Sequence, residues 1–484
     1  MNHNRMQRVL FVSYLFPPTG GVGVHRVTKF VKYLPDWGWE SSVLTVSNPS
    51  VPLQDESLLS DIPAGTIIRR AKTYEPGYAV KQAVSGGQNS NRQGFSLVRN
   101  LKHLARKCAN TLLQPDSQIL WHPHAMKAGL QLLADVRHDA IIATGPPFSS
   151  FLLGARLARK SGLPLILDYR DEWDISNAYW ENKGHGRFAN WIQTRQQARV
   201  VKAAQVLLAT TPSSAAAIGR FAQTHGSSAR STFIYNGFDP DDYTAAPVPV
   251  GPSRQHTQRR FRIAFIGTLW NLNSIQPVIS ALLRINTQNP ELADEIELLV
   301  AGRRTPDQEE ILDQLSTSRV QLTRMPFVSH PEAIELMHSA DALLMINSDL
   351  PKAQQIINAK TFEYMAARRP MFVVAPRGDV WDLVQDLPGT MLSIPGDISG
   401  IASRLELAVE RYRCGTSEHD AIWEISQFER KNLAQQLAGQ LNAVIQQSAE
   451  ERSTSSPTPW TGRSTNDFTG ISERNISERG NPEC

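Results

Sequence analysis

Short apolar runs alternate with amphipathic stretches along most of the chain. In the first half these runs are continuously apolar, which is typical of strands buried on both faces of a parallel sheet, and the segments between them place apolar residues at helical spacing. The predicted strands are 8–16, 41–47, 139–144, 164–169, 205–210 and 232–235. The pattern therefore predicts a doubly wound α/β domain over residues 1–245.

The alternation stops at residues 246–260, which are rich in proline, polar and basic residues and show no hydrophobic periodicity. We expect this segment to be an interdomain linker. A second alternation covers residues 261–415. Its predicted strands are 261–267, 295–302, 319–325, 341–346 and 370–375, and its predicted helices are 274–287, 331–339 and 356–367. The predicted fold class is α/β, with two doubly wound, Rossmann-like domains in tandem.

Three polar segments lie outside this alternation. Residues 416–447 form a long helical pattern, and residues 448–484 are rich in serine, threonine, asparagine and proline, so we expect a C-terminal helical segment followed by a disordered tail. Residues 95–113 interleave basic side chains with an apolar helical face. Such a helix can lie on an anionic membrane surface, or it can pack on its own domain with a solvated basic face, and both interpretations stay open.

Composition excludes several classes of protein. A length of 484 residues suits two domains, and a net charge of +4 does not favour nucleic acid as a partner. Cys108, Cys414 and Cys484 lie far apart in the sequence, which fits a reducing compartment and offers no zinc site. The apolar residues 9–16 fit a first buried strand better than a signal peptide, and no run of about 18 apolar residues predicts a spanning helix. We expect a cytoplasmic protein, with peripheral contact to the inner face of the membrane through residues 95–113 as an alternative.

The first predicted strand leads into a glycine-rich turn, FPPTGGVGVHR, at residues 16–26. Gly20, Gly21 and Gly23 let a ligand approach the backbone where a helix begins, and the free N–H groups at a helix start favour an anion. The same glycines can simply form the turn. Arg26 stands where a dinucleotide-binding motif needs a small residue, so we exclude a dehydrogenase.

Other motifs that carry chemistry are absent from the sequence. It has no GxxxxGK[ST] phosphate loop, no Gly-x-Ser-x-Gly nucleophile elbow, no His-Glu-x-x-His pair and no compact metal-ligand cluster. DPDD at residues 239–242 resembles a metal-binding Asp-x-Asp motif, but its position between the last strand and the linker favours an exposed turn. We therefore expect neither a metal nor another cofactor.

An ordered set of segments carries a family resemblance. The segments are FPPTGGVG (16–23), GPPFSSFLLGARLARKSGLPLILDYRDEWD (145–174), FIGTLWNLN (265–273) and NAKTFEYMAARRP (358–370), with PDSQILW (115–121) as a further one. Together they resemble retaining GT-B glycosyltransferases of the family-four group. The resemblance implies that the acceptor lies against the N-terminal domain, that the nucleotide lies against the C-terminal domain, and that transfer occurs in the cleft between them without a bound metal.

The resemblance also assigns a donor site. Glu363 matches the glutamate that holds the ribose hydroxyls, and a carboxylate suits that task because it can accept two hydrogen bonds from a cis-diol. The donor's phosphates need positive charge, for which Lys360 and Arg303 are the candidates. Lys360 and Glu363 can alternatively form an ordinary helix ion pair.

Backbone groups complete the predicted donor site. Gly267 and Thr268 precede a helix start that can offer N–H donors to phosphate. Phe327 and Val328 resemble the place where the family's backbone meets the base, although Phe327 can equally serve packing. Gln355 occupies the position of the first glutamate in the family's Glu-x7-Glu pair and can bind a sugar hydroxyl through its amide.

The predicted catalytic residues belong to the first half. Asp168, Arg170 and Asp171 end a strand and therefore face the crevice at the carboxyl edge of the sheet, where open α/β folds bind ligands. We expect Asp171 to orient the acceptor or the sugar, or else to form a structural ion pair with Arg170. His25 is the candidate to replace a histidine that many relatives carry, because Phe151 stands at that position here.

Two further departures from the family pattern concern the donor side. Asn273 stands near the place where an arginine or lysine usually meets the donor phosphate, and Gln355 brings no charge to the sugar. The leading function is nevertheless a glycosyltransferase that moves a sugar from a UDP- or GDP-sugar to a saccharide or lipid-linked acceptor, as in polysaccharide biosynthesis. The alternatives are a non-catalytic relative that binds a nucleotide sugar and a GT-B-fold nucleotide-sugar epimerase.

Overall fold

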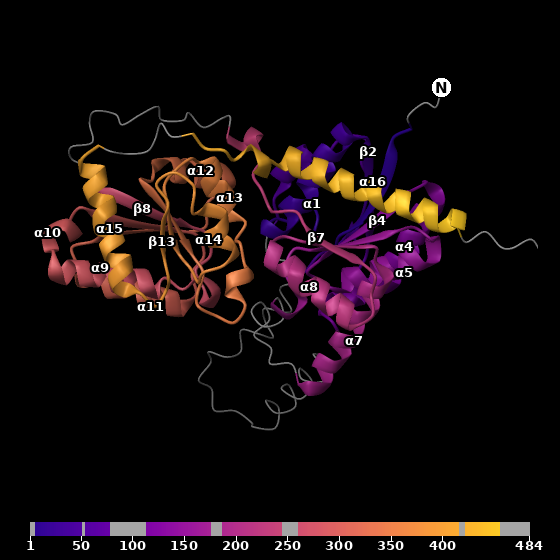
Figure 1. Cartoon of the computed structure of the whole chain (residues 1–484), viewed down its shortest axis with the longest axis horizontal. Coiled ribbons are helices and arrows are strands. Elements are labelled where there is room, and N and C mark those ends of the chain that lie inside the picture. Colours follow the sequence, from indigo (N-terminus) through magenta and orange to yellow (C-terminus); the bar gives the residue numbers. More distant parts are fainter. Residues whose placement is uncertain are drawn as a thin grey trace, which may run out of the picture.

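The computed structural model describes residues 5–50, 54–77, 113–175, 186–243, 260–415 and 422–454. They form two α/β domains that lie side by side (Figure 1). The basic amphipathic pattern at 95–113 lies outside the described residues except for Leu113, as do the predicted linker apart from Arg260 and the tail from residue 455. Among the described helices, none combines the length and the apolar character needed to span a bilayer.

The first domain contains a seven-stranded sheet in the order β3-β2-β1-β4-β5-β6-β7, and every pairing in it is parallel. The strands are β1 (Gln7–Val12), β2 (Trp39–Val46), β3 (Ile67–Ala71), β4 (Ala140–Gly145), β5 (Leu165–Tyr169), β6 (Val206–Ala209) and β7 (Arg230–Phe233). The helices are α1 (Val22–Tyr33), α4 (His122–Asp135), α5 (Ser149–Ser161), α7 (Arg187–Ala203) and α8 (Pro212–Thr224).

Both faces of this sheet are buried, which explains the continuous apolar runs in its strands. In β1, Leu10 and Val12 join the core that contains α4 and α5, whereas Val9 and Phe11 join the core on the opposite face. Successive side chains of a strand point to opposite faces, so a strand covered on both sides has no polar position to alternate with.

The second domain repeats this arrangement with six parallel strands in the order β10-β9-β8-β11-β12-β13. The strands are β8 (Phe261–Ile266), β9 (Ile296–Ala301), β10 (Gln321–Met325), β11 (Ala342–Ile346), β12 (Met371–Val374) and β13 (Met391–Ser393). The helices are α9 (Gln276–Gln288), α10 (Pro290–Ala293), α11 (Pro306–Asp313), α12 (His330–Ser339), α13 (Lys360–Ala366), α14 (Asp379–Val384) and α15 (Ile398–Arg413). The predicted α/β class with two doubly wound domains is confirmed.

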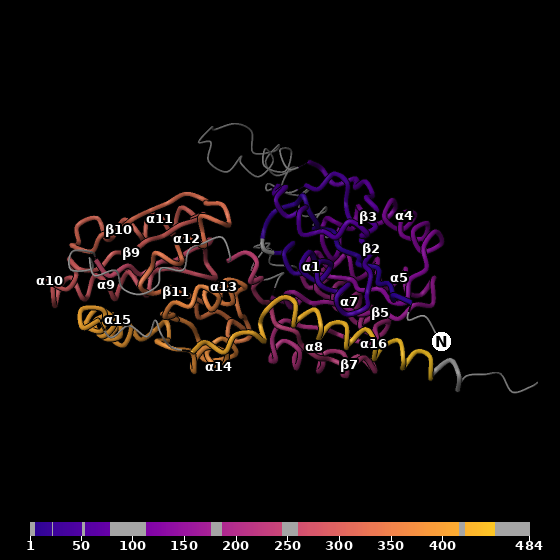
Figure 2. The backbone as a smooth tube through the Cα atoms, turned by 90° about the horizontal axis from the view of Figure 1, so that it is seen from above, coloured from indigo at the N-terminus to yellow at the C-terminus, as the bar shows by residue number. Residues whose placement is uncertain are grey.

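The last described helix, α16 (Arg430–Thr454), returns to the first domain. Figures 1 and 2 show it lying along that domain, beside α1. Leu433, Leu437 and Leu441 of α16 enter the core that also holds Val27 and Phe30 of α1. The helix begins later and ends later than the predicted segment at 416–447, and a 3-10 turn at Ser426–Phe428 comes just before it.

Candidate active site

The carboxyl ends of the two parallel sheets face each other. Thr211 and Ser213 follow β6 of the first domain, and Gln355 and Asp379 follow β11 and β12 of the second. The Thr211 hydroxyl donates to the Gln355 main-chain oxygen at 3.0 Å, and the Ser213 hydroxyl donates to Asp379 Oδ1 at 2.6 Å. The loops that follow the strands of each domain therefore meet, which is where open α/β folds bind their ligands.

A small polar cavity lies between the domains at this level. It is formed by the start of α1, the loop after β7, the starts of α12 and α13, and the first residue of α16. Its lining residues are His25, Lys29, Gly237, Phe238, Asp239, Asp242, Tyr243, His330, Glu363 and Arg430. Glu363 and His25, which come from opposite domains, thus share one cavity.

Glu363 lies in the first turn of α13, and its side chain is 33% exposed. Its Oε1 atom is 3.5 Å from His330 Nε2, at the start of α12. Burial opposes ionisation of the carboxyl, but the hydrogen bond and the positive charge of His330 outweigh it and hold the pKa of Glu363 below its usual value. The carboxylate is therefore ionised and directed toward the cavity.

The two histidines of the cavity behave differently. The hydrogen bond to Glu363 raises the pKa of His330 against the opposing effect of burial. Burial lowers the pKa of His25 to about 4, although the Glu363 charge works in the other direction. His330 is thus the partner of the carboxylate, and His25 is a neutral imidazole near pH 7 that can donate one hydrogen bond and accept another.

Lys360 begins α13, one turn before Glu363. Its ammonium nitrogen is buried, lies 3.8 Å from the centre of the Phe265 ring, and has no hydrogen-bond partner among the described residues. Burial lowers the pKa of Lys360 to about 7, and Glu363 opposes that shift only in part. A buried ammonium without a hydrogen bond is costly, so this position favours an added anionic group.

The predicted donor loops gather around Lys360. Gly267 has φ +137°, a backbone conformation that favours glycine, and a Cβ atom there would lie 2.9 Å from Lys360 Nζ, so the loop passes close to the lysine. Leu269 N donates to the Arg303 main-chain oxygen at 2.9 Å, which places Arg303 beside the loop that contains exposed Thr268. The Arg303 guanidinium lies 5.8 Å from the centre of the exposed Phe327 ring.

The remaining donor-side residues are less accessible. Val328 is partly buried. The side-chain oxygen of Gln355 is buried and has no hydrogen-bond partner among the described residues. Asn273 is buried, and its side chain contacts the backbone of its own loop, so it serves that loop's structure.

On the first domain, the three glycines of the glycine-rich turn differ in the space that surrounds them. Gly21 has φ +104° and starts α1, and a Cβ atom there would have open space around it. A Cβ atom on Gly20 would lie 3.2 Å from the Asp55 side chain. A Cβ atom on Gly23 would lie 2.4 Å from the Arg170 guanidinium. The Arg170 side chain therefore occupies the space over Gly23, whereas the space at Gly21 is open to a ligand.

Arg170 and Asp171 do not pair. The Arg170 guanidinium donates to the main-chain oxygens of Gly23 and Pro146, and no ion pair joins it to Asp171 in the part of the chain that the structure describes. Burial raises the pKa of Asp171, with Arg170 opposing. Asp168 is a structural residue, since its carboxylate is buried against Arg26, with Oδ1 3.1 Å from Arg26 Nε. Asp171 is thus the carboxylate of this loop that is left for a ligand.

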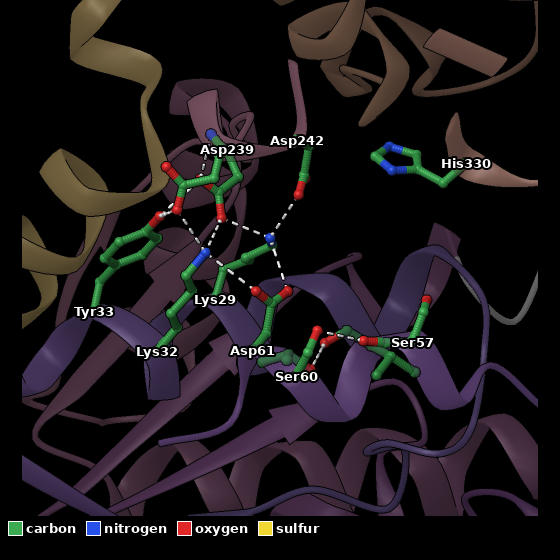
Figure 3. Close-up of polar contacts among 12 residues, drawn as sticks. Lys29, Lys32, Tyr33, Ser57, Ser60, Asp61, Asp239, Asp242 and His330 are labelled. Carbon is green, nitrogen blue, oxygen red and sulfur yellow. Dashed lines mark hydrogen bonds and ion pairs between the residues drawn. The ribbon is translucent and has the colours of Figure 1, made fainter. Parts of the chain in front are cut away.

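The DPDD sequence is not the exposed turn that its composition suggests. The Asp239 side chain is fully buried and accepts from Lys29 Nζ at 2.6 Å, Lys32 Nζ at 2.9 Å and Tyr33 Oη at 2.7 Å (Figure 3). Lys29 also contacts Asp242, which Figure 3 shows between this network and His330. The two lysines and the tyrosine outweigh burial and lower the pKa of Asp239 to about 2. The aspartates therefore fasten α1 to the loop that leaves the first domain.

Phe151 is completely buried and has a structural role. Its ring lies 4.6 Å from the Tyr169 ring and 5.5 Å from the Phe148 ring, centre to centre. It is not among the residues that line the cavity.

The structure adds two site residues that the sequence did not single out. His330 precedes a proline at a helix start, which gives no signal of its own. Arg430 is buried, donates its backbone N–H to Phe238 O at 2.8 Å, and has a guanidinium nitrogen without a hydrogen-bond partner among the described residues. Burial, helped by the Arg26 charge, lowers the pKa of Arg430 to about 10, so it stays cationic.

Comparison with known proteins gives a consistent picture. Residues 20–237 match the family model of the glycosyl transferase 4-like domain. No curated protein sequence matches the chain significantly.

Several solved structures share the fold. One is Anabaena Alr3699/HepE in complex with UDP-glucose, at 16% identity and a TM-score of 0.50 over 92% of this chain and 99% of that one. Another is the lipopolysaccharide outer core galactosyltransferase WaaB in its apo form. It is 14% identical, with a TM-score of 0.51 over 92% of this chain and 100% of that one. A third is sucrose-phosphate synthase from Thermosynechococcus elongatus. It is 13% identical, with a TM-score of 0.54 over 93% of this chain and 98% of that one. At these identities the likeness establishes the fold.

Proposed function

We propose, from the premise that this chain is a GT-B glycosyltransferase with a glycosyl transferase 4-like domain at residues 20–237, that it transfers a sugar from a nucleotide-sugar donor to a glycan or lipid-linked acceptor, with retention and without a metal. The observation that carries the donor assignment is the pair formed by Lys360 and Glu363. One turn of α13 presents a buried ammonium without a hydrogen bond and an ionised carboxylate. A nucleoside diphosphate sugar offers the matching groups, namely phosphate oxygens and a ribose diol.

The positions of the two side chains support this assignment. The Glu363 carboxylate can accept both ribose hydroxyls while His330 holds its other side. Lys360, beside Gly267, can neutralise a phosphate, and exposed Arg303 can reach the same diphosphate from the next strand end. In this proposal Phe327, whose ring centre is 5.8 Å from the Arg303 guanidinium, contacts the base, and Gln355 binds a sugar hydroxyl. That the HepE relative was solved with UDP-glucose supports a UDP-sugar as the first donor to test.

The chemistry follows from these charges. The bond from the anomeric carbon to the donor phosphate breaks, and the developing negative charge on the phosphate is stabilised by Lys360 and Arg303. The acceptor hydroxyl attacks the same face of the sugar, and its proton passes to the departing phosphate oxygen, which gives retention. His25, neutral at pH 7, and Asp171 lie on the acceptor's domain and orient the acceptor or the sugar.

A panel of UDP-, GDP- and ADP-sugars tests this function. Binding and slow donor hydrolysis are measured with the full chain, and then with Glu363→Ala and with Glu335→Ala, an exposed glutamate of α12, as the matched control. We expect one class of nucleotide sugar to bind, and its affinity to fall about tenfold or more in Glu363→Ala alone, since hydrogen bonds to a charged group contribute about 1.5–3 kcal/mol each. Absence of binding by every donor would refute the proposal.

A second candidate function is a non-catalytic nucleotide-sugar-binding relative. The burial of Phe151 and Asn273 favours it, because neither side chain can replace the polar group expected at its position. The same panel separates the two candidates. Donor binding that depends on Glu363, without transfer to any saccharide or lipid-linked acceptor, would support the non-catalytic relative.

A further inference from the structure

Helix α7 on the first domain has one face fixed by packing. Ala189, Gln193, Gln197 and Val200 are buried, and Trp173 Nε1 donates to Gln193 Oε1 at 3.1 Å. This contact fixes the rotation of the helix about its axis. The opposite face is therefore held permanently toward solvent.

That solvent face carries an ordered stripe, which we call the α7 stripe. Its members are separated by three or four positions and so line one side of the helix: Phe188, Trp191, Arg195, Arg199 and Lys202, all of them exposed. Phe188 is 61% exposed and Trp191 is 49% exposed. Their rings stack with centres 5.8 Å apart, and the Arg195 guanidinium lies 4.0 Å from the centre of the Trp191 ring.

The charge of the α7 stripe is of one sign. The sequence of α7, RFANWIQTRQQARVVKA, contains four basic residues and no aspartate or glutamate. In the part of the chain that the structure describes, no carboxylate pairs with the three basic side chains of the stripe. Two large aromatic rings exposed side by side are costly to leave in water, and the adjacent cations add a positive charge that an anionic partner can neutralise.

We propose that the α7 stripe docks this protein on an anionic lipid bilayer. Tryptophan and phenylalanine insert at the level of the lipid headgroups, and arginine and lysine along the same helix face meet the anionic headgroups. The stripe lies on one helix that extends to the edge of the first domain (Figure 1), whereas a single-stranded nucleic acid usually follows a basic groove built from several elements. This inference is independent of the function proposed above.

Cosedimentation of the full chain with lipid vesicles tests the proposal. The vesicles are phosphatidylcholine alone and phosphatidylcholine mixed with phosphatidylglycerol. We expect binding to the mixed vesicles, weakened by salt, and a loss of about tenfold or more in both Phe188→Ser/Trp191→Ser and Arg195→Glu/Arg199→Glu. The matched controls are Leu407→Ser, an exposed apolar residue of α15, and Arg220→Glu/Arg319→Glu, two exposed arginines outside α7.

Two further measurements separate a loss of vesicle binding from a loss of the fold or of the nucleotide site. Thermal unfolding identifies any variant that has lost its fold, and donor hydrolysis reports the nucleotide site independently. Vesicle binding that is unchanged in both α7 variants would overturn the proposal, as would absence of binding to either kind of vesicle. Binding of a single-stranded oligonucleotide that needs Arg195 and Arg199, without vesicle binding, would assign the stripe to nucleic acid instead.

Discussion

The His25 ring of the first domain lies 5.9 Å from the His330 ring of the second, centre to centre. The two rings close one side of the cavity that contains Glu363. Because His330 contacts the Glu363 carboxylate and His25 does not, the arrangement raises the pKa of His330 while burial lowers that of His25. The charge of the proposed ribose site therefore depends on a histidine of its own domain.

Replacing His330 should weaken nucleotide binding. We expect His330→Ala to lower the affinity about fivefold, since a hydrogen bond to a charged group contributes about 1.5–3 kcal/mol and partial exposure reduces that value. His330→Gln, which keeps a donor without the charge, should lose less. Calorimetric titration with the nucleotide that binds in the donor panel measures both variants. His124→Ala is the control and should bind the nucleotide like the wild type. An unchanged nucleotide affinity in His330→Ala would show that His330 does not contribute to the site.

Donor affinity should fall as the pH rises above about 7. Burial lowers the pKa of Lys360 to about 7 in the unliganded protein, and only the ammonium form binds phosphate. Below that pKa the cation is present; above it, binding must take up a proton, so affinity falls by up to about tenfold per pH unit. Titrations between about pH 6 and about pH 9 measure this slope. The Lys360→Met variant should bind the donor weakly, and its affinity should not depend on pH in this range. If the affinity of that variant still falls with pH, another group is responsible for the pH dependence.

The Asp239 network should stabilise the first domain. We expect Asp239→Asn to lower the free energy of unfolding by about 3 kcal/mol, because it leaves Lys29 buried with less compensation. Urea unfolding measures the loss, and Asp241→Asn is the control, since that side chain is 68% exposed and should contribute about 0–1 kcal/mol. The contribution of Asp239 is present above the usual carboxyl pKa of about 4 and is lost as the pH falls toward about 2. The difference in free energy of unfolding between wild type and Asp239→Asn should therefore become smaller as the pH falls from about 4 to about 2.

The contact between Ser213 and Asp379 should favour the closed arrangement of the domains. Asp379 accepts from both the hydroxyl and the backbone N–H of Ser213, at 2.6 and 3.1 Å. We expect Asp379→Ala to raise the radius of gyration in small-angle X-ray scattering and to raise KM more than it lowers kcat. Asp382→Ala, an exposed neighbour on α14, should change neither quantity. Equal scattering from both variants would show that this contact does not hold the domains together.

The sequence predicted the fold well wherever burial is two-sided. The interior strands stand out because their apolar runs are continuous. Two of the four edge strands, β3 and β13, were missed: β3 contains Arg69 and Arg70 on a partly exposed edge, and β13 has only three residues. Neither length nor pattern separates such strands from loops.

The sequence singled out candidates in both domains, His25 and Glu363 among them, but it predicted a contact only within one helix. Lys360 and Glu363 share a helical turn, so their proximity follows from spacing. His25, His330 and Arg430 meet because two domains and a returning helix converge, and no local pattern contains that information. Asp239 was misjudged for the same reason, since its lysine partners lie on a distant helix.

The return of α16 to the first domain has a consequence for biosynthesis. Val27 and Phe30 of α1 are made early, but the residues that complete their core, Leu433 and Leu437 among them, leave the ribosome after the whole second domain. Domains generally fold as units during synthesis, starting from the N-terminus. Here the first domain must wait with an open apolar face, so the second domain is the first that can complete its own core.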